Sequence, residues 1–310
     1  MGLGILFAVL GALSFSMNAV TIRRGVTRGA ASQGLYLTVF SGTVLFVIAA
    51  LIAGQLLQAG SVGGRDYAFM AASGVVHILG GRYCNYRAIG ALGANRSQPV
   101  VGTSTLFSIA IAILWLNEGL DLMKGIGIVL VMIGPAMVAP RRRSAPRAAP
   151  AGASGTAPKA EVKPFTPKVM EGYFFGVAAA VLWGAGPVLM RAGVGSNGLG
   201  VLGGTVAYGS AAALLLVTLL IPGQARGAIT LDRNARGMFL IGGMSSWLAN
   251  MFRFSALALA PVSIVIPLMR SAVLFTLLMN FVFNRHLESF EPKVLAGIAI
   301  STAGAILLVI

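Results

Sequence analysis

Long apolar stretches, separated by short polar ones, dominate this chain. An α-helix needs about 20 consecutive apolar residues to cross the hydrocarbon core of a bilayer. The runs are continuous and do not show the short alternating pattern of β-barrel strands, so helices are the predicted way of satisfying the backbone. The pattern therefore predicts an all-α polytopic membrane protein with ten transmembrane helices. They are expected at residues 2–22, 33–54, 67–90, 95–116, 124–139, 172–191, 200–221, 237–258, 262–283 and 293–310.

The second half of the chain repeats the first. At an offset of 168 positions Ala88 corresponds to Ala256, and Pro99 corresponds to Pro267. The offset becomes 170 near the ends of the halves, where Gly127 matches Gly297. Because each half holds five spans, an odd number, the second half is expected to enter the membrane in the opposite direction, as in many secondary transporters.

Three regions follow from this repeat. A basic segment rich in Pro and Ala separates the halves and has too little apolar surface to form a core, so we expect a disordered linker. The predicted division is 1–139 for the first five-span repeat, 140–170 for the linker and 171–310 for the second five-span repeat.

Composition supports the membrane interpretation. Hydrophobic residues make up 57% of the chain, charged residues make up 10%, and the mean hydropathy is +0.87. Soluble domains carry about 25% charged residues. The net charge of +15 resides mainly in loops and in the linker, which does not favour nucleic acid as a partner.

The positive charges also predict an orientation. Of the 23 Lys and Arg residues, 15 lie in odd-numbered loops and 3 in even-numbered loops. The positive-inside rule then places the linker in the cytoplasm and both termini outside. The expected location is a multi-pass position in a bacterial inner membrane.

Arginine and asparagine within the spans are the first candidates for a site. Charged groups inside a membrane usually face a cavity or a partner. Arg82 and Asn85 in the third span correspond to Asn250 and Arg253 in the eighth, so each helix carries one Arg and one Asn three residues apart on one face. Arg270 in the ninth span has no arginine counterpart and is predicted to be the principal contact for an anion. The alternative is that these side chains bond helices to one another.

Three further polar or aromatic residues lie on the same helices. His77 is near the centre of the third span and is a candidate proton carrier, with a neutral structural histidine as the alternative. Tyr83 and Trp247 are candidates for substrate contact, with simple packing as the alternative.

The acidic residues all lie in loops or at span ends. They are Asp66, Glu118, Asp121, Glu161, Glu171, Asp232, Glu288 and Glu291. An exporter of cationic drugs is expected to keep a carboxylate inside the membrane. Arginines occupy that region instead, which favours a substrate with a carboxylate or another anionic group, because guanidinium groups bind such groups in a bidentate manner. No sequence motif of an enzyme is present, and no metal or cofactor is expected.

Several segments resemble the EamA-like branch of the drug/metabolite transporter superfamily. The matching segments are YRAIGALGANRSQPV, LNEGL and GIGIVLVMIG in the first repeat and FSALALAPVSIVIPL, HLESF and AGIAISTAGA in the second. The resemblance implies ten spans in two repeats and the export or exchange of small metabolites or drugs. It also places the family's glutamate after the fourth helix on Glu118 and Glu288, where it is expected to be structural.

The sequence thus predicts a secondary transporter that exports or exchanges a small polar metabolite, and two alternatives stay open. These are an efflux permease for neutral or cationic compounds, such as drugs or amino acids, and a membrane scaffold that transports nothing. The predicted partners are the lipid bilayer and a small-molecule substrate, and the choice between a monomer and a homodimer stays open.

Overall fold

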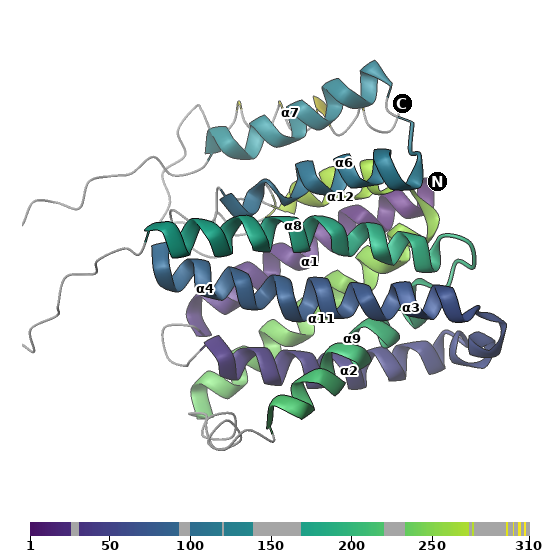
Figure 1. Ribbon diagram of the computed structural model, residues 1–310, viewed down its shortest axis with the longest axis vertical. Coiled ribbons are helices and arrows are strands. Elements are labelled where there is room, and N and C mark those ends of the chain that lie inside the picture. The colour runs from purple at the N-terminus through teal and green to yellow at the C-terminus, as the bar shows by residue number, and fades with distance from the viewer. Residues whose placement is uncertain are drawn as a thin grey trace, which may run out of the picture.

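The computed structural model describes residues 1–25, 31–92, 100–119, 121–138, 169–219 and 233–272, together with residues 275, 296, 300, 303, 304 and 307. Within these residues the regular structure is entirely helical (Figure 1). The helices are α1 (Gly2–Gly25), α2 (Ala31–Ile52), the 3₁₀ turn η1 (Leu56–Ser61), α3 (Gly64–Ser73), the π-helix η2 (Gly74–Gly81), α4 (Arg82–Leu92), α6 (Ser104–Leu116), α7 (Leu122–Val138), α8 (Val169–Val194), α9 (Gly200–Leu219), α11 (Arg233–Leu259) and α12 (Val262–Arg270).

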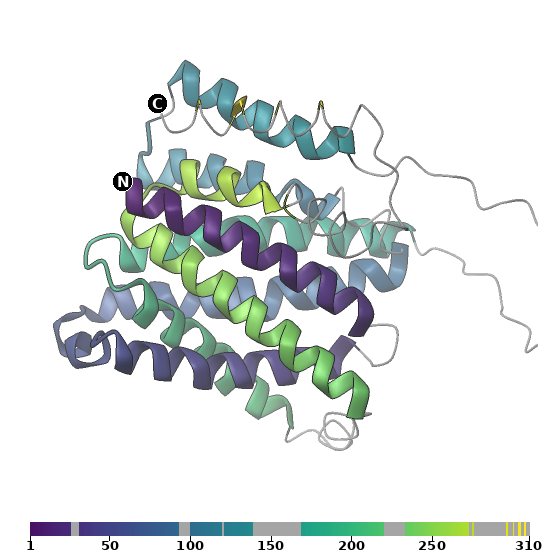
Figure 2. The same ribbon diagram turned by 180° about the vertical axis from the view of Figure 1, so that it is seen from behind.

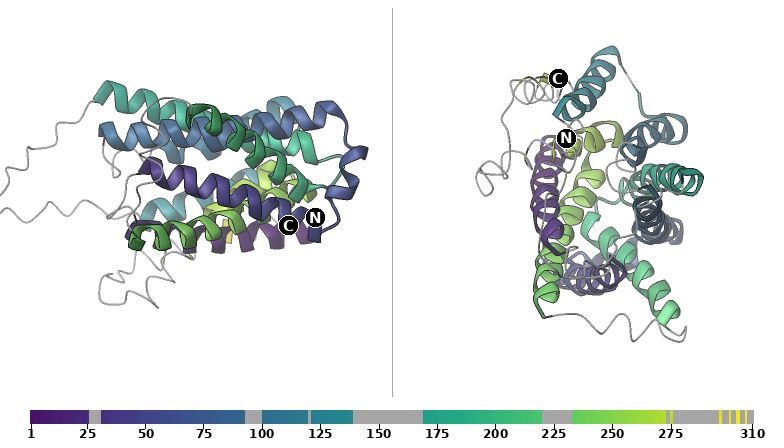
Figure 3. Two further views of the ribbon diagram at one scale, coloured as in Figure 1. Left: turned by 90° about the horizontal axis from the view of Figure 1, so that it is seen from below. Right: turned by 90° about the vertical axis from the view of Figure 1, so that its left-hand side faces the viewer.

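The all-helical fold class is confirmed for the described residues. The third predicted span is one continuous helix made of α3, η2 and α4. Of the ninth predicted span, α12 covers Val262–Arg270 and a turn follows at Ser271, while most of the remainder lies outside the described residues. Most of the tenth predicted span lies outside the described residues. Seen end on, the helices form a bundle with their axes roughly aligned (Figure 3, right).

Large apolar side chains cover the outside of the bundle. Ile52, Leu57, Leu114 and Met170 are each more than 80% exposed. Within the described residues three helical stretches are long and apolar enough to cross a bilayer, namely Leu35–Ile52, Val169–Val194 and Gly200–Thr218. Apolar surface of this extent is stable against lipid and not against water, so the protein is an integral membrane protein.

Equivalent helices of the two halves lie antiparallel. Along α2 and α9, which correspond at an offset of 168, the hydroxyl of Tyr36 meets the hydroxyl of Thr218 at 2.9 Å. Thr205, nearer the start of α9, donates a hydrogen bond of 3.1 Å to the carbonyl oxygen of Phe46, nearer the end of α2. Residues later in α2 therefore contact residues earlier in α9, as expected for antiparallel helices.

The first helix of each half packs on the third span of the other half. Gly4 near the start of α1 approaches Ala260, and Gly11 approaches the carbonyl oxygen of Ala249 in α11. Glycine is needed at these positions because a Cβ atom on Gly4 would lie 2.9 Å from the Cβ of Ala260. Figure 2 shows α1 and α11 crossing along their lengths.

The same arrangement holds α8 against the third span of the first half. Gly193 near the end of α8 approaches Met70 in α3, and Gly176 near its start approaches Ala88 in α4. In an antiparallel pair of helices, the residue numbers of two facing positions have a nearly constant sum. That sum is nearly the same for α8 and the third span as for α1 and α11. The two helix pairs therefore pack in equivalent registers.

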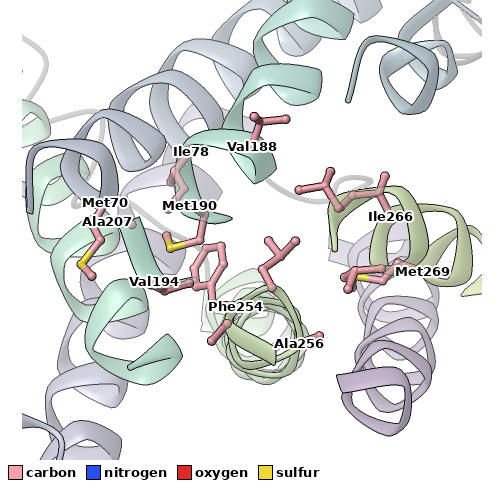
Figure 4. Packing of buried hydrophobic residues seen from close by; sticks show 14 of the residues in the cluster. Met70, Ile78, Val188, Met190, Val194, Ala207, Phe254, Ala256, Ile266 and Met269 are labelled. Atoms are coloured by element: carbon pink, nitrogen blue, oxygen red, sulfur yellow. The ribbon is translucent and has the colours of Figure 1, made fainter. Parts of the chain in front are cut away.

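The apolar core joins both halves. Met70 from α3 and Met190 and Val194 from α8 converge on Gly203 of α9, where any side chain would collide with Val194. Figure 4 shows this group together with Phe254 of α11, while Ile266 and Met269 belong to the separate helix α12. Close contact between α3, α8, α9 and α11 fixes the third and eighth spans relative to each other.

Candidate functional site

A π-helical segment positions His77. The π-helix η2 has the sequence GVVHILGG, and such segments inside α-helices are frequent at functional sites. Its glycines let neighbouring helices approach, since a Cβ on Gly81 would overlap Trp183 of α8. The indole Nε1 of Trp183 in turn donates a hydrogen bond of 3.0 Å to the carbonyl oxygen of His77. Sequence patterns predicted an ordinary helix here.

Arg253 of α11 contacts His77 across the boundary between the halves. Its Nη1 lies 2.8 Å from Nε2 of His77. Because a guanidinium group can only donate, Nε2 must be the acceptor, and the proton of the neutral ring then resides on Nδ1. The guanidinium also lies over the rings of Phe254 and Phe15, at 4.9 and 5.8 Å from their centroids. Arg253 is only 6% exposed.

Four buried polar atoms on the third and eighth spans have no hydrogen-bond partner. They are Nδ1 of His77, Oδ1 of Asn85, Nε1 of Trp247 and Nε of Arg253, and no other buried side-chain nitrogen or oxygen of the described residues shares this state. All four belong to the third and eighth spans, and all four residues are among those predicted from the sequence. Three of the four atoms are N–H donors, and the amide of Asn85 presents a donor when it is turned by 180°.

Such atoms are costly to bury. A polar group removed from water without a partner costs about 1–3 kcal/mol in proteins. Unpartnered donors on the two spans that also carry the buried guanidinium of Arg253 are therefore suited to a ligand that brings acceptor oxygens.

The remaining residues of the two Arg/Asn pairs differ in their surroundings. Asn250 is buried and donates hydrogen bonds of 2.9 Å to the hydroxyl of Tyr208 and 2.7 Å to the carbonyl oxygen of Ser246. Arg82 is partly buried, and its Nη1 lies 3.4 Å from the hydroxyl of Thr38. The charge of Arg82 acts electrostatically on both His77 and Arg253.

Tyr83 and Arg270 lie apart from this group. Tyr83 is 52% exposed and packs edge-on against Phe175. Arg270 ends α12, and its guanidinium donates hydrogen bonds to the hydroxyls of Thr105 and Ser104 on α6. No described contact joins Arg270 directly to Arg253 or His77.

The helix α8 accepts hydrogen bonds from both α3 and α6. Pro187 removes one backbone donor from this helix. Close to it, Ser73 of α3 donates to the carbonyl oxygen of Gly186 over 2.8 Å. Ser108 of α6 donates to the carbonyl oxygen of Gly184, also over 2.8 Å. Through neighbouring carbonyl groups, these bonds connect α8 to α3, which continues into the segment that holds His77, and to α6, which contacts Arg270.

The fourth and ninth spans are interrupted at equivalent positions. A turn at Thr103 precedes α6, and a turn at Ser271 follows α12, 168 positions later. Each interruption lies four residues after a proline, at position 99 in the first half and at position 267 in the second. Broken helices are a feature of substrate sites in transporters.

Charged residues at helix ends have structural roles. Both carboxylate oxygens of Glu118 accept backbone hydrogen bonds, from Val262 at 2.8 Å and from Ser263 at 2.9 Å. This confirms the expectation that Glu118 is structural at a helix end. Arg191 donates to the carbonyl oxygens of Leu257 and Ala258 at the end of α11.

Sequence reasoning missed several partners. Tyr208, Thr38, Phe15 and the hydroxyl pair Ser104–Thr105 were not selected. Hydroxyl groups within otherwise apolar helices were the available signal. Within the described residues, no three His, Cys, Asp or Glu side chains are grouped so that they could hold a metal ion.

Comparisons with known proteins agree with this architecture. The model of the EamA-like transporter family matches residues 2–139 and 170–310. A solved crystal structure, described only as that of a protein, is similar with a TM-score of 0.73 and 16% identity, and the match covers 98% of this chain and 95% of that one. At that identity the likeness shows the fold alone. No curated protein matches the chain.

Proposed function

The chain belongs to the EamA-like transporter family, a family of membrane transporters and not of enzymes, and we propose that it moves a small polar metabolite bearing a carboxylate or another anionic group. The single observation that carries the anionic part is the set of unpartnered polar atoms on the third and eighth spans, with Nε of the buried Arg253 among them. Transport would proceed by alternating access between two inverted repeats, as an export or an exchange.

The packing of the described helices supports inverted repeats. Equivalent helices α2 and α9 lie antiparallel, and α1 and α8 each pack on the third span of the opposite half in equivalent registers. A two-fold axis in the membrane plane produces both features. We therefore propose ten transmembrane helices in two five-helix repeats, with 1–139 and 171–310 as the repeats and 140–170 as the linker.

The proposed binding group lies on the third and eighth spans. Arg253 supplies the positive charge, His77, Asn85 and Trp247 supply polar atoms without partners, and Arg82 adds a second charge nearby. Asn250 and Tyr83 remain proposed contacts from the same two helices. In an inverted-repeat carrier this is where substrate binds, near the midplane between the repeats.

Arg270 remains a proposed anion contact, where α12 meets α6. Its described partners, Ser104 and Thr105, are neutral hydroxyls, so its positive charge is not compensated by them. A charge kept inside a membrane without a counter-ion is expensive, and a substrate anion offers compensation.

The acidic residues disfavour a cationic substrate. The four that the structure describes are at helix ends or in connections, where Glu118 binds backbone N–H groups and Glu171 pairs with Arg87. The pKa of Asp121 is lowered by a backbone hydrogen bond from Lys124. None of these carboxylates is placed to balance a cation between the third and eighth spans.

The location and orientation follow from the charge pattern. We propose a multi-pass protein of a bacterial inner membrane with a cytoplasmic linker, because 15 of 23 basic residues lie in the odd-numbered loops. The linker carries seven of them. A measurement of the mass of the protein in detergent will show whether it is a monomer or a homodimer.

A thermal-shift experiment tests the substrate class. The purified full-length protein is heated with L-lactate, succinate or L-glutamate, and with lactamide, which has the shape of lactate without its charge. A ligand that binds the folded state raises the melting temperature by mass action. We expect an acid to stabilise the protein and lactamide to leave it unchanged. Arg253→Gln should weaken the binding of that acid by about 30-fold or more.

Arg87→Gln is the matched control, because it removes a half-exposed arginine of α4 that pairs with Glu171, and it should keep the response. Stabilisation by cationic or neutral compounds alone would favour the efflux permease. Flux in proteoliposomes then separates a transporter from a scaffold, since a folded protein that moves no stabilising ligand contradicts transport.

A further inference from the structure

We propose that His77 takes up a proton when the anionic substrate binds Arg253, so that substrate and proton cross the membrane together. The inference rests on the proposed function, because it assigns the coupling ion of that same site. It is carried by the single contact between Nε2 of His77 and Nη1 of Arg253.

Because of this contact, His77 cannot accept a hydrogen bond from Arg253 at Nε2 and carry a proton on Nε2 at the same time. Nε2 of a neutral imidazole has one lone pair in the plane of the ring. That lone pair accepts the N–H of Arg253 in this structure, at 2.8 Å. A proton on Nε2 would turn the acceptor into a donor and would place two positive charges in contact. His77 can therefore be protonated only after Arg253 has found another acceptor.

A carboxylate is such an acceptor. Its two oxygens can take N–H groups of Nη1 and Nη2 of Arg253 together, in the bidentate manner, and so replace His77 as the acceptor for Nη1. The lone pair of His77 is then free, and the negative charge of the ligand offsets the charge of Arg253. Binding of the anion thus removes both obstacles to protonation of the histidine.

The other groups facing His77 do not compete for this role. Arg82 on α4 and Arg253 on α11 are the charged groups that act on it, and both are permanent cations that oppose protonation. The α8 side contributes Trp183, which does not titrate, and Gly186. On α9 the titratable group is Tyr208, which is bonded to Asn250. The described part of this region holds no carboxylate, so the histidine is the group able to change its charge.

The balance of charge follows directly. A monocarboxylate brings one negative charge and the histidine gains one positive charge, so the loaded site carries the same net charge as the empty site. A site whose charge is unchanged can reorient across the membrane without working against the membrane potential. Release of the anion on the other side restores the Arg253 contact and expels the proton.

Proton uptake on binding is the decisive measurement. The binding of L-lactate, succinate and L-glutamate to the purified protein is followed by calorimetry in buffers of different ionisation enthalpy. We expect about one proton to be taken up per bound ligand molecule in the wild-type protein. His77→Gln, whose amide oxygen can accept from Arg253 but cannot be protonated, should bind more weakly and take up none.

The only other histidine, His286, provides the matched control. His286→Gln should take up protons as the wild type does. In the His286→Gln protein, the nitrogen NMR signals of the remaining histidine report His77 alone. They should show a neutral ring protonated on Nδ1 without ligand and a doubly protonated ring with it.

The outcomes separate the two proposals. Binding of an acid without proton uptake, or with equal uptake in His77→Gln, would overturn the coupling and leave the anion site standing. Absence of binding for all three acids would overturn the proposed function and the coupling with it. A ring protonated on Nε2 in the ligand-free protein would also contradict the coupling.

Discussion

Thr103 and Ser271, which are 168 positions apart, make the same hydrogen bond. Each hydroxyl donates over 2.6 Å to the carbonyl oxygen three residues earlier, from Thr103 to Val100 and from Ser271 to Leu268. The backbone N–H groups of both residues point to the same carbonyls. The interruptions of the fourth and ninth spans are thus one local structure that occurs twice, and Arg270 comes directly before the second.

We expect the hydroxyls at these interruptions to matter more for transport than for stability. Thr103→Ala and Ser271→Ala each remove one hydrogen bond, worth about 0.5–1.5 kcal/mol, while the backbone N–H still occupies the carbonyl. Without the hydroxyl a regular helix can continue through the turn, and flux in proteoliposomes should fall. Ser14→Ala is the control, since its hydroxyl bonds within the uninterrupted helix α1. Equal flux in all three variants would show that the interruptions are passive.

The neighbouring glycines Gly80 and Gly81 should differ sharply in their tolerance of alanine. A Cβ on Gly80 would meet Leu182 at 3.4 Å, an ordinary contact, whereas a Cβ on Gly81 would overlap the indole of Trp183. Overpacking of this kind costs about 1–3 kcal/mol. Gly81→Ala should therefore lower the melting temperature and move Trp183, whereas Gly80→Ala should melt near the wild type. Tryptophan fluorescence reports the displacement, and indistinguishable variants would contradict the close contact of η2 and α8.

Glu118 should contribute to stability by binding the start of α12. Glu118→Ala removes an acceptor for two backbone N–H groups and a negative charge at the helix N-terminus, a loss of about 1–2 kcal/mol. Glu118→Gln keeps one acceptor and should lose less. Glu171→Gln, which weakens a surface ion pair with Arg87, should cost at most about 1 kcal/mol. The measurement is the melting temperature in detergent, and the idea fails if Glu118→Ala melts no earlier than Glu171→Gln.

The sequence predicts the helices better than it predicts their neighbours. Runs of apolar residues and the constant offset of 168 identify which helices correspond, because both signals are local or repeated along the chain. Which helices touch is decided by small residues at close contacts, such as Gly11 on Ala249. One sequence without its structure does not reveal which glycine faces which helix.

For the candidate site, the sequence likewise predicts which residues are buried better than it predicts what they contact. Spacing correctly placed Asn85 and Arg253 on buried faces of equivalent helices, since residues three apart share a face. The contact of Arg253 with His77 depends on the π-helical turn of η2, which rotates the histidine relative to an α-helix of the same sequence. Arg270 ends α12 because the chain turns at Ser271. The hydroxyl of Ser271 makes a local hydrogen bond in that turn, and the spacing of apolar residues does not predict such a bond.

The last prediction separates a binding role of Arg270 from a structural one. Its Nε and Nη2 groups donate to Thr105 and Ser104 across the boundary between α12 and α6. Lysine keeps the charge but has no planar fork, so Arg270→Lys should bind the stabilising acid more weakly while it folds nearly as the wild type does. Arg270→Gln removes the charge and should abolish transport of that acid.

The hydroxyl partners supply the matched control for this prediction. Changing Ser104 to Ala and Thr105 to Val removes what holds the guanidinium but leaves its charge in place. If the charge serves the substrate, this double variant should still transport, at a reduced rate, whereas Arg270→Gln should not transport at all. The melting temperature is measured alongside flux for each protein. If Arg270→Gln transports normally but melts much earlier, the arginine serves to join α12 to α6, and that bond accounts for its place inside the membrane. The anion role then falls to Arg253 alone.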